Sequence, residues 1–205
     1  MAQAPTLDPP AAPPYRRMSY EEFLEDTCEE HAEWVDGEVI PMATVSEFHN
    51  ATTRWLIHIL STLVEESGIG RIFREPFNQK LPASSGRSPD VMILLAAHMD
   101  RMRLNHLDGP ADVVIEVLSP GTAGVDRGDK YLEYEAAGVA EYWLFDPQRQ
   151  VAEFYRLAPN GLYRLVPVEA GGRFESAVRP GIWLQENWLW ERPALRIVEA
   201  AYGLR

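Results

Sequence analysis

The run Asp112-Val113-Val114-Ile115-Glu116-Val117-Leu118 constrains the fold more than any other part of the sequence. Its β-branched residues predict a central strand. A carboxylate inside such a strand is costly unless it is paired, protonated or bound to a cation. Alternation along a strand places Val114, Glu116 and Leu118 on one face. Because two of these three side chains are apolar, we favour a buried Glu116 over the alternative, a strand face exposed to solvent.

A second carboxylate, Asp90, follows Pro89 at the start of the short apolar run Asp90–Leu95. If the two strands are neighbours, Asp90 and Glu116 converge and offer the hard oxygen ligands that suit Mg²⁺ or Mn²⁺. Such a metal ion would support hydrolysis of a phosphodiester, and a nearby protein cation would stabilise the charge that develops.

Lysine usage suggests where that cation lies. The chain has 19 Lys and Arg residues, and only Lys80 and Lys130 are lysines. A lysine that is kept in so arginine-rich a chain is consistent with a need for a compact ammonium group. Lys130 stands at the start of a predicted helix after the Glu116 strand, within reach of the end of that strand. A solvated lysine placed there by chance is the alternative.

Periodicity and turn signals predict the remaining elements. Helices are expected from the capping box at Ser19 to about Thr27, over Ser46–Ser67, and over Arg127–Ala137 before Gly138. Strands are expected over Ala32–Met42 (a hairpin turning at Asp36-Gly37), Arg71–Leu81, Glu141–Asp146, and a meander of Val151–Leu157, Leu162–Val168 and Arg173–Val178. The Trp-rich segment Trp183–Trp190 is expected to pack as a short helix or a cover. This order predicts an α/β (α+β) fold in one domain over residues 16–205, after a disordered Pro/Ala-rich leader over residues 1–15.

Charge and composition limit the function. A net charge of −12 argues against a nucleic-acid partner, because such proteins are usually basic. A local groove of arginines beside Asp90 would answer this objection, and the candidates are Arg71, Arg74, Arg87, Arg101, Arg103 and Arg127. The single Cys28 fits a cytoplasmic location, and no apolar run is long enough to cross a membrane.

Several motifs, taken in order, resemble the Uma-type putative restriction endonuclease family of the PD-(D/E)XK nuclease superfamily. The matching segments are Glu33-Trp34-Val35-Asp36-Gly37-Glu38, His49, Ser88-Pro89-Asp90-Val91, Val114-Ile115-Glu116-Val117-Leu118-Ser119-Pro120, Asp126 with Lys130 and Tyr134, Gly138, Glu141-Tyr142-Trp143-Leu144-Phe145-Asp146-Pro147, and Pro180-Gly181. The resemblance covers nearly everything after Tyr15. It implies a restriction-endonuclease-like mixed β-sheet flanked by helices, with Asp90 and Glu116 as the ligands of Mg²⁺ or Mn²⁺.

The resemblance also implies roles for other residues. The superfamily pattern has a lysine two residues after the glutamate, where this chain has Leu118, and the family similarity nominates Lys130 in its place. Glu33 is expected to be a further acidic ligand or to organise water. His49 and Asp126 are expected nearby, either in the chemistry or as structural hydrogen-bonding residues.

The function that follows is a Mg²⁺-dependent endonuclease that hydrolyses DNA, with DNA as partner and a homodimer as the expected assembly. The alternative is a non-catalytic binding or assembly module that retains the nuclease fold. Hydrolysis of another phosphate ester is a third reading.

Overall fold

The computed structural model describes residues 15–26, 31–42, 44–82, 85–168 and 172–203. Cys28 and all of the predicted leader except Tyr15 lie outside these ranges, so the division into a leader and one domain stays a prediction. None of the helices in the described ranges combines the length and the apolar character needed to span a bilayer.

Two six-stranded sheets and one two-stranded sheet contain the described strands. Sheet A has the order β1 (Arg16–Arg17), β3 (Glu38–Pro41), β2 (Ala32–Val35), β6 (Ser85–Arg87), β5 (Asn78–Leu81) and β8 (His106–Asp108). Sheet B has the order β12 (Tyr163–Val166), β11 (Val151–Leu157), β10 (Glu141–Asp146), β9 (Val113–Val117), β7 (Val91–Leu95) and β4 (Gly70–Arg74). The third sheet pairs β13 (Arg173–Glu175) with β14 (Trp183–Gln185). In sheets A and B, β5 with β8 and β9 with β10 are parallel pairs among antiparallel ones.

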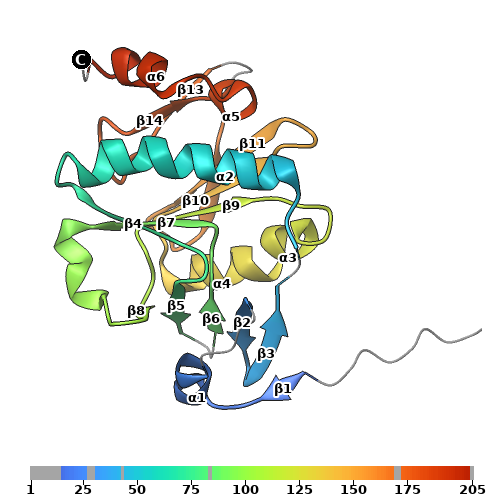
Figure 1. The fold of residues 1–205 in the computed structure, drawn as a ribbon. Coiled ribbons are helices and arrows are strands. Elements are labelled where there is room, and N and C mark those ends of the chain that lie inside the picture. The colour runs from blue at the N-terminus through green and yellow to red at the C-terminus, as the bar shows by residue number, and fades with distance from the viewer. Residues whose placement is uncertain (1–14, 27–30, 43, 83–84, 169–171, 204–205) are drawn as a thin grey trace, which may run out of the picture.

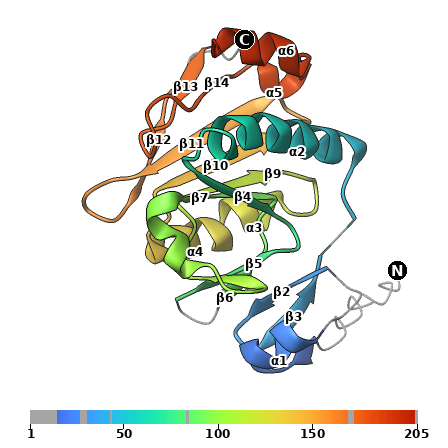
Figure 2. The ribbon, with the colours of Figure 1, turned by 60° about the vertical axis from the view of Figure 1, so that its left-hand side comes forward.

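Helices cover both faces of sheet B. The described helices are α1 (Tyr20–Glu25), which packs against sheet A, α2 (Glu47–Leu60) continued by the π-helical turn η1 (Ser61–Glu65), the 3₁₀ segment η2 (Ala96–Arg101), α3 (Ala123–Arg127), α4 (Asp129–Ala137), α5 (Trp188–Glu191) and α6 (Leu195–Ala201). Helix α2 crosses one face of sheet B, beneath the C-terminal elements, and α4 lies between the other face and sheet A (Figures 1 and 2). The predicted fold class, a mixed α+β fold with helices around mixed sheets, is confirmed.

The alternation of β9 divides the core in two. Val113, Ile115 and Val117 pack toward α2 and the third sheet, and Val114 and Leu118 pack toward α4. All five are 5% exposed or less. Glu116 therefore lies on the α4 side, in a layer that is otherwise apolar, as the alternation in the sequence predicts.

Several local predictions are confirmed. Ser19 and Glu22 form the capping box of α1, and Ser46 caps α2. Asp36 and Gly37 both have positive φ, as a tight hairpin turn between β2 and β3 requires.

Three predicted elements are wrong in detail. The segment predicted as one strand over Arg71–Leu81 is two strands, β4 and β5, in different sheets; they are separated by a turn at Pro76, which has no N–H to donate to a ladder. The helix predicted over Arg127–Ala137 begins only at Asp129, as α4. Gly128, whose backbone is not helical, separates α4 from α3, which ends at Arg127. The third strand of the meander, β13, pairs with β14 instead of β12.

Candidate active site

The carboxylates of Asp90 and Glu116 meet across neighbouring strands. The register of β7 and β9 places Val91 opposite Ile115, so Asp90, just before β7, lies across from Glu116. The Asp90 N–H points to Glu116 Oε2 at 3.4 Å, and the Val117 N–H donates to Asp90 Oδ2 at 2.7 Å. Both acidic side chains are buried, at 7% and 5% exposure. The predicted convergence of these two carboxylates is thus present in the structure.

Lys130 projects from the first turn of α4 into a cluster of carboxylates. Its Nζ lies 2.9 Å from Glu116 Oε1, 3.2 Å from Glu33 Oε1 and 3.2 Å from Asp126 Oδ1. One turn further along α4, the Tyr134 hydroxyl donates to Glu116 Oε1 at 3.1 Å. The i, i+4 spacing of Lys130 and Tyr134 brings both groups to the same carboxylate.

The other lysine of the chain has a different environment. Lys80 is 42% exposed, pairs with the exposed Glu21 at 3.1 Å, and lies over the Tyr20 ring. Of the two lysines, only Lys130 lies near the Asp90–Glu116 pair.

Burial and neighbouring charges shift the protonation equilibria of this cluster. Burial raises the pKa of the Glu116 carboxyl well above its ordinary value; Lys130 opposes the shift, and the carboxylates of Asp126 and Asp90 add to it. Burial also raises the pKa of Asp126. For Lys130, burial favours the neutral amine, but Glu116, Glu33 and Asp126 outweigh it and raise its pKa. The cluster thus favours a charged lysine beside carboxylates that are under strong mutual repulsion.

Glu33 reaches the site from sheet A. Its Oε2 accepts from Arg87 Nη1 at 2.8 Å, and its Oε1 accepts from the Ser88 N–H at 3.2 Å. Burial raises the pKa of Glu33, but Lys130 and Arg87 more than compensate, so the net shift is downward. The Glu33 oxygens already accept hydrogen bonds from Arg87 and Ser88 and pair with Lys130. Glu33 is therefore better placed to position Lys130 than to bind a metal ion.

His49 lies in the first turns of α2 and contacts Asp90. Its Nε2 is 3.0 Å from each carboxylate oxygen of Asp90. Burial lowers the pKa of His49, and the hydrogen bond and charge of Asp90 outweigh this effect and raise it. His49 Nδ1 is buried and has no hydrogen-bond partner among the residues that the structure describes.

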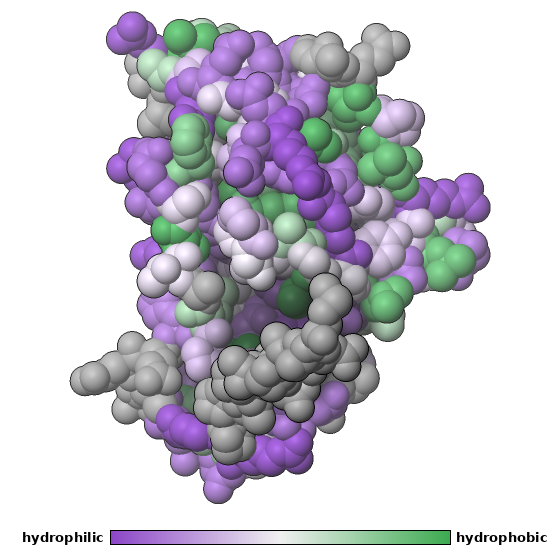
Figure 3. Space-filling view, turned by 90° about the vertical axis from the view of Figure 1, so that its right-hand side faces the viewer, coloured by the Kyte–Doolittle hydropathy of each residue, from purple (hydrophilic) through white to green (hydrophobic). Residues whose placement is uncertain are grey.

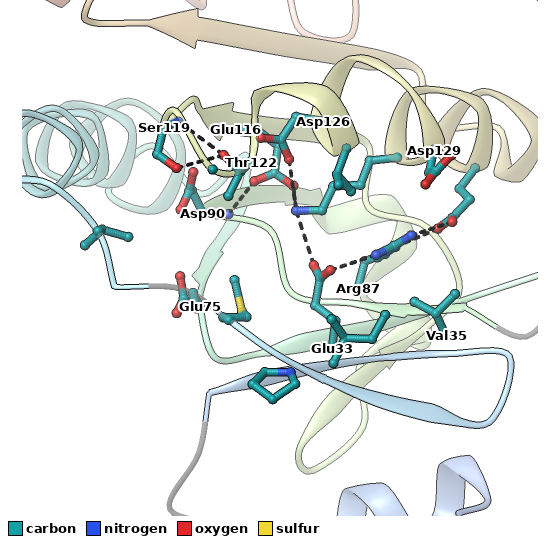
Figure 4. Close-up of a pocket in the computed structure, with 18 of the residues that line it drawn as sticks. Glu33, Val35, Glu75, Arg87, Asp90, Glu116, Ser119, Thr122, Asp126 and Asp129 are labelled. Carbon is teal, nitrogen blue, oxygen red and sulfur yellow. Dashed lines mark hydrogen bonds and ion pairs between the residues drawn. The ribbon is translucent and has the colours of Figure 1, made fainter. Parts of the chain in front are cut away.

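These side chains line one open cavity of about 680 Å³, which we call the acidic cavity. Eight carboxylates and two cations, Arg87 and Lys130, are among its lining groups. Figure 4 shows Glu116 with Asp126 on one side and Glu33 bound to Arg87 on the other; the ion pairs of Lys130 connect the two groups. Figure 3 shows that the molecule is hollowed on the face turned to the viewer, with a hydrophilic floor.

The carboxylates of Asp90 and Glu116 are hard oxygen donors of the kind that a divalent ion such as Mg²⁺ prefers. Within the described ranges, no three His, Cys, Asp or Glu side chains are grouped so as to hold a metal ion. Asp90 and Glu116 nevertheless present two carboxylates to one open cavity, and Mg²⁺ is commonly held by one or two carboxylates while it keeps several waters. The residues present therefore fit such an ion.

The sequence pattern that defines the Uma2 family, described as putative restriction endonuclease, matches residues 18–187. The chain belongs to the Uma2 family. Among solved structures, it is similar to a protein described as a putative nuclease belonging to DUF820 from Anabaena variabilis ATCC 29413, with 21% identity and a TM-score of 0.68. That likeness covers 85% of this chain and 98% of the other, and it shows a shared fold. No sequence among the curated proteins matches.

The Uma2 motifs divide into site residues and structural residues. Glu141, in the Glu-Tyr-Trp motif, is fully buried away from the cavity. It accepts hydrogen bonds from Ser176 Oγ and the Ala177 N–H, both at 2.8 Å, and pairs with Arg156 at 3.1 Å. This motif therefore ties β10 to the segment after β13. The sequence alone does not predict this role for Glu141, because Arg156, Ser176 and Ala177, which donate to its carboxylate, are distant in the chain.

The six arginines named as candidates do not form a single surface groove beside Asp90 in this Uma2 chain. Arg87 is buried between Glu33 and Glu133, and Arg127 pairs with Glu153. Arg71, Arg101 and Arg103 do not line the acidic cavity. Of the six candidates, only Arg74 is an exposed side chain in a hollow that Asp90 also lines.

Proposed function

We propose that this protein is a metal-dependent endonuclease that hydrolyses phosphodiester bonds of DNA. Membership in the Uma2 family supports the nuclease class. The observation that carries the proposal is the meeting of Asp90, Glu116 and Lys130, which come from separate parts of the chain, in one open cavity.

In this proposal Asp90 and Glu116 hold Mg²⁺ or Mn²⁺. When bound, the ion would polarise the phosphoryl oxygen, lower the pKa of a bound water and stabilise the leaving oxygen. Glu116 Oε1 accepts from Lys130 and Tyr134, so Oε2, on the side of Asp90, is the oxygen of Glu116 that remains for the ion.

Side chains of the protein orient the attacking water and balance the negative charge that develops on the phosphate. Lys130 provides an ammonium that directs the attacking water and stabilises the negative charge that develops on the phosphoryl oxygens. The water gives up one proton to solvent as its oxygen forms a bond to phosphorus, the bond from phosphorus to the leaving sugar oxygen breaks, and a proton from solvent is delivered to that leaving oxygen. Glu33 positions Lys130, and His49 fixes the orientation of Asp90.

Cleavage of plasmid and linear duplex DNA by the purified full chain, with Mg²⁺, with Mn²⁺ and with a chelator, tests the proposal. Asp90→Asn and Glu116→Gln keep side-chain volume and are expected to lower the rate on the order of 10²–10³-fold, as when one group that stabilises the transition state is removed. Asp112→Asn is the matched control, because Asp112 is a buried carboxylate at the other end of β9 that binds His98 and the Leu95 N–H. Equal cleavage by all four proteins would sink the assignment.

Metal titration by calorimetry separates this enzyme from a non-catalytic module with the same fold. An enzyme of the proposed kind binds Mn²⁺, and Glu116→Gln abolishes that binding. Absence of both binding and cleavage in the unaltered protein would favour the module.

The proposal includes DNA as the partner, a cytoplasmic location and a homodimer in which two sites act on two strands. The single Cys28 supports the location. Sedimentation of the purified chain tests the dimer, and cleavage of matched RNA and DNA duplexes tests the choice of nucleic acid.

A further inference from the structure

A second hollow, of about 840 Å³, adjoins the acidic cavity and is far less acidic. We call it the α2 groove. It is lined by Arg54, Arg74 and three histidines, and the carboxylates that line it among the described residues are those of Glu75 and Asp90. Asp90, His49 and Glu75 line both hollows, so the groove leads directly to the carboxylate pair.

One stripe of α2 forms a wall of the groove. Asn50, Arg54 and His58 recur at four-residue spacing and are exposed, while Leu56 and Leu60 on the opposite face are buried in the core. At a rise of 1.5 Å per residue, the stripe from Asn50 to His58 is about 12 Å long. Since a strand of B-DNA advances about 3.4 Å per nucleotide along the helix axis, this length matches about three nucleotides.

The cations of the groove are available to a ligand. Within the described part of the chain, neither Arg54 nor Arg74 has a carboxylate within ion-pairing distance, whereas Arg87 and Arg127 are each held by carboxylates. Among the described residues, the Arg74 guanidinium donates only to the Glu75 backbone carbonyl, at 3.3 Å. Two unpaired guanidinium groups in one hollow of a chain with a net charge of −12 are a local exception to its acidity.

Two unsatisfied polar atoms also line the groove. His49 Nδ1 and Thr53 Oγ1 are buried, and neither has a hydrogen-bond partner among the described residues. The His49 side chain is only 8% exposed. Buried polar atoms are normally satisfied, so these two indicate a ligand or ordered water in the groove.

From these observations we infer that the α2 groove binds the phosphates next to the bond that is cut, along one DNA strand. This inference rests on the proposed function and adds the path of the strand to it. The carboxylates of the acidic cavity repel a polyanion, so the backbone reaches Asp90 from the α2 side, where Arg54 and Arg74 attract it.

DNA binding without cleavage provides the test. The affinity of a fluorescent duplex of about 20 base pairs is measured by anisotropy in chelator at several salt concentrations. The proteins are the unaltered full chain, Arg54→Ala/Arg74→Ala, and the control Arg164→Ala/Arg179→Ala. The control arginines are also exposed and without an ion pair among the described residues, and Arg164 lies on β12, at the opposite edge of sheet B from Arg74.

The groove variant is expected to bind at least about tenfold more weakly at roughly 0.1 M salt. Its salt slope should be lower by about two, since each phosphate contact contributes about 0.9. The control should resemble the unaltered protein in both quantities, and the melting temperatures of all three should agree. Equal loss in the groove and control variants, no loss in the groove variant, or no binding by the unaltered protein would each overturn the inference.

Two outcomes separate the path of the strand from the nuclease activity. Cleavage that depends on Glu116 together with unchanged DNA affinity in the groove variant refutes the strand path and leaves the nuclease intact. Loss of affinity in the groove variant, in a protein that cuts no DNA, supports the phosphate groove and refutes the nuclease.

Discussion

Replacement of Lys130 by methionine tests whether one ammonium holds the buried carboxylates together. Methionine is unbranched and has a similar length, so Lys130→Met removes the charge while it fills most of the space. The Lys130 side chain is 6% exposed, and its Nζ lies within 3.2 Å of Glu33, Glu116 and Asp126. The variant leaves these three acidic groups buried without their shared cation.

The expected cost is large. Removal of one partner from a buried ion pair lowers the free energy of unfolding by about 3–5 kcal/mol, because an uncompensated buried charge remains. In a chain of this size each kcal/mol corresponds to roughly 2–4 °C, so the melting temperature should fall by roughly 6–20 °C. Protonation of Glu116, or substitution by glutamine, should relieve part of this loss.

Urea unfolding in the presence of a chelator measures the effect. A double-mutant cycle with Glu116→Gln should give an interaction free energy of about 1–3 kcal/mol, because the two side chains are in direct contact. Lys80→Met is the matched control, since Lys80 and its partner Glu21 are both exposed to solvent, which weakens such pairs. If Lys130→Met unfolds at the same urea concentration as Lys80→Met, the argument for a buried ion cluster is refuted.

Three further predictions concern single positions. Glu141→Gln should lower the free energy of unfolding by about 1–3 kcal/mol because it weakens the bonds to Arg156 and the chain after β13, yet cleavage at low temperature should persist; a selective loss of cleavage would contradict a structural role. Tyr134→Phe removes the hydroxyl that donates to Glu116, and we expect about 1 kcal/mol less stability together with slower cleavage; unchanged values of both would show that this bond is unimportant. Gly138→Ala should cost about 1–2 kcal/mol in urea unfolding, because Gly138 ends α4 with φ at +83° and nothing within 4 Å of the added Cβ compensates; no loss would argue against the left-handed cap.

The sequence was sufficient to predict the residues whose environment follows from a local pattern. Glu116 stands in a β-branched strand, and alternation alone predicts its side of the sheet. Lys130 was predicted from composition and family resemblance, and its contact with Glu116 is present at 2.9 Å. Hairpin and capping signals were reliable because they depend on four or fewer consecutive residues.

The errors come from features that depend on distant parts of the chain. The division of the strands between sheets A and B is decided by pairing partners, so β4 and β5 could not be separated by alternation. The burial of Arg87 depends on Glu33 and Glu133, which approach it from β2 and α4. The α2 groove was also missed, since Arg54 and Arg74 belong to elements that meet only in the folded chain.

The chain passes from sheet A to sheet B in the three residues after Arg87, and a site residue stands at each end of this crossing. Arg87 ends β6 beside Glu33, and Asp90 precedes β7 beside Glu116. The connection between the two sheets therefore also positions residues of the candidate site. A shortened chain that begins after β3 would keep Asp90, Glu116 and Lys130 but lose Glu33, and an exchange of the N-terminal hairpin between relatives would replace part of the candidate site together with the scaffold.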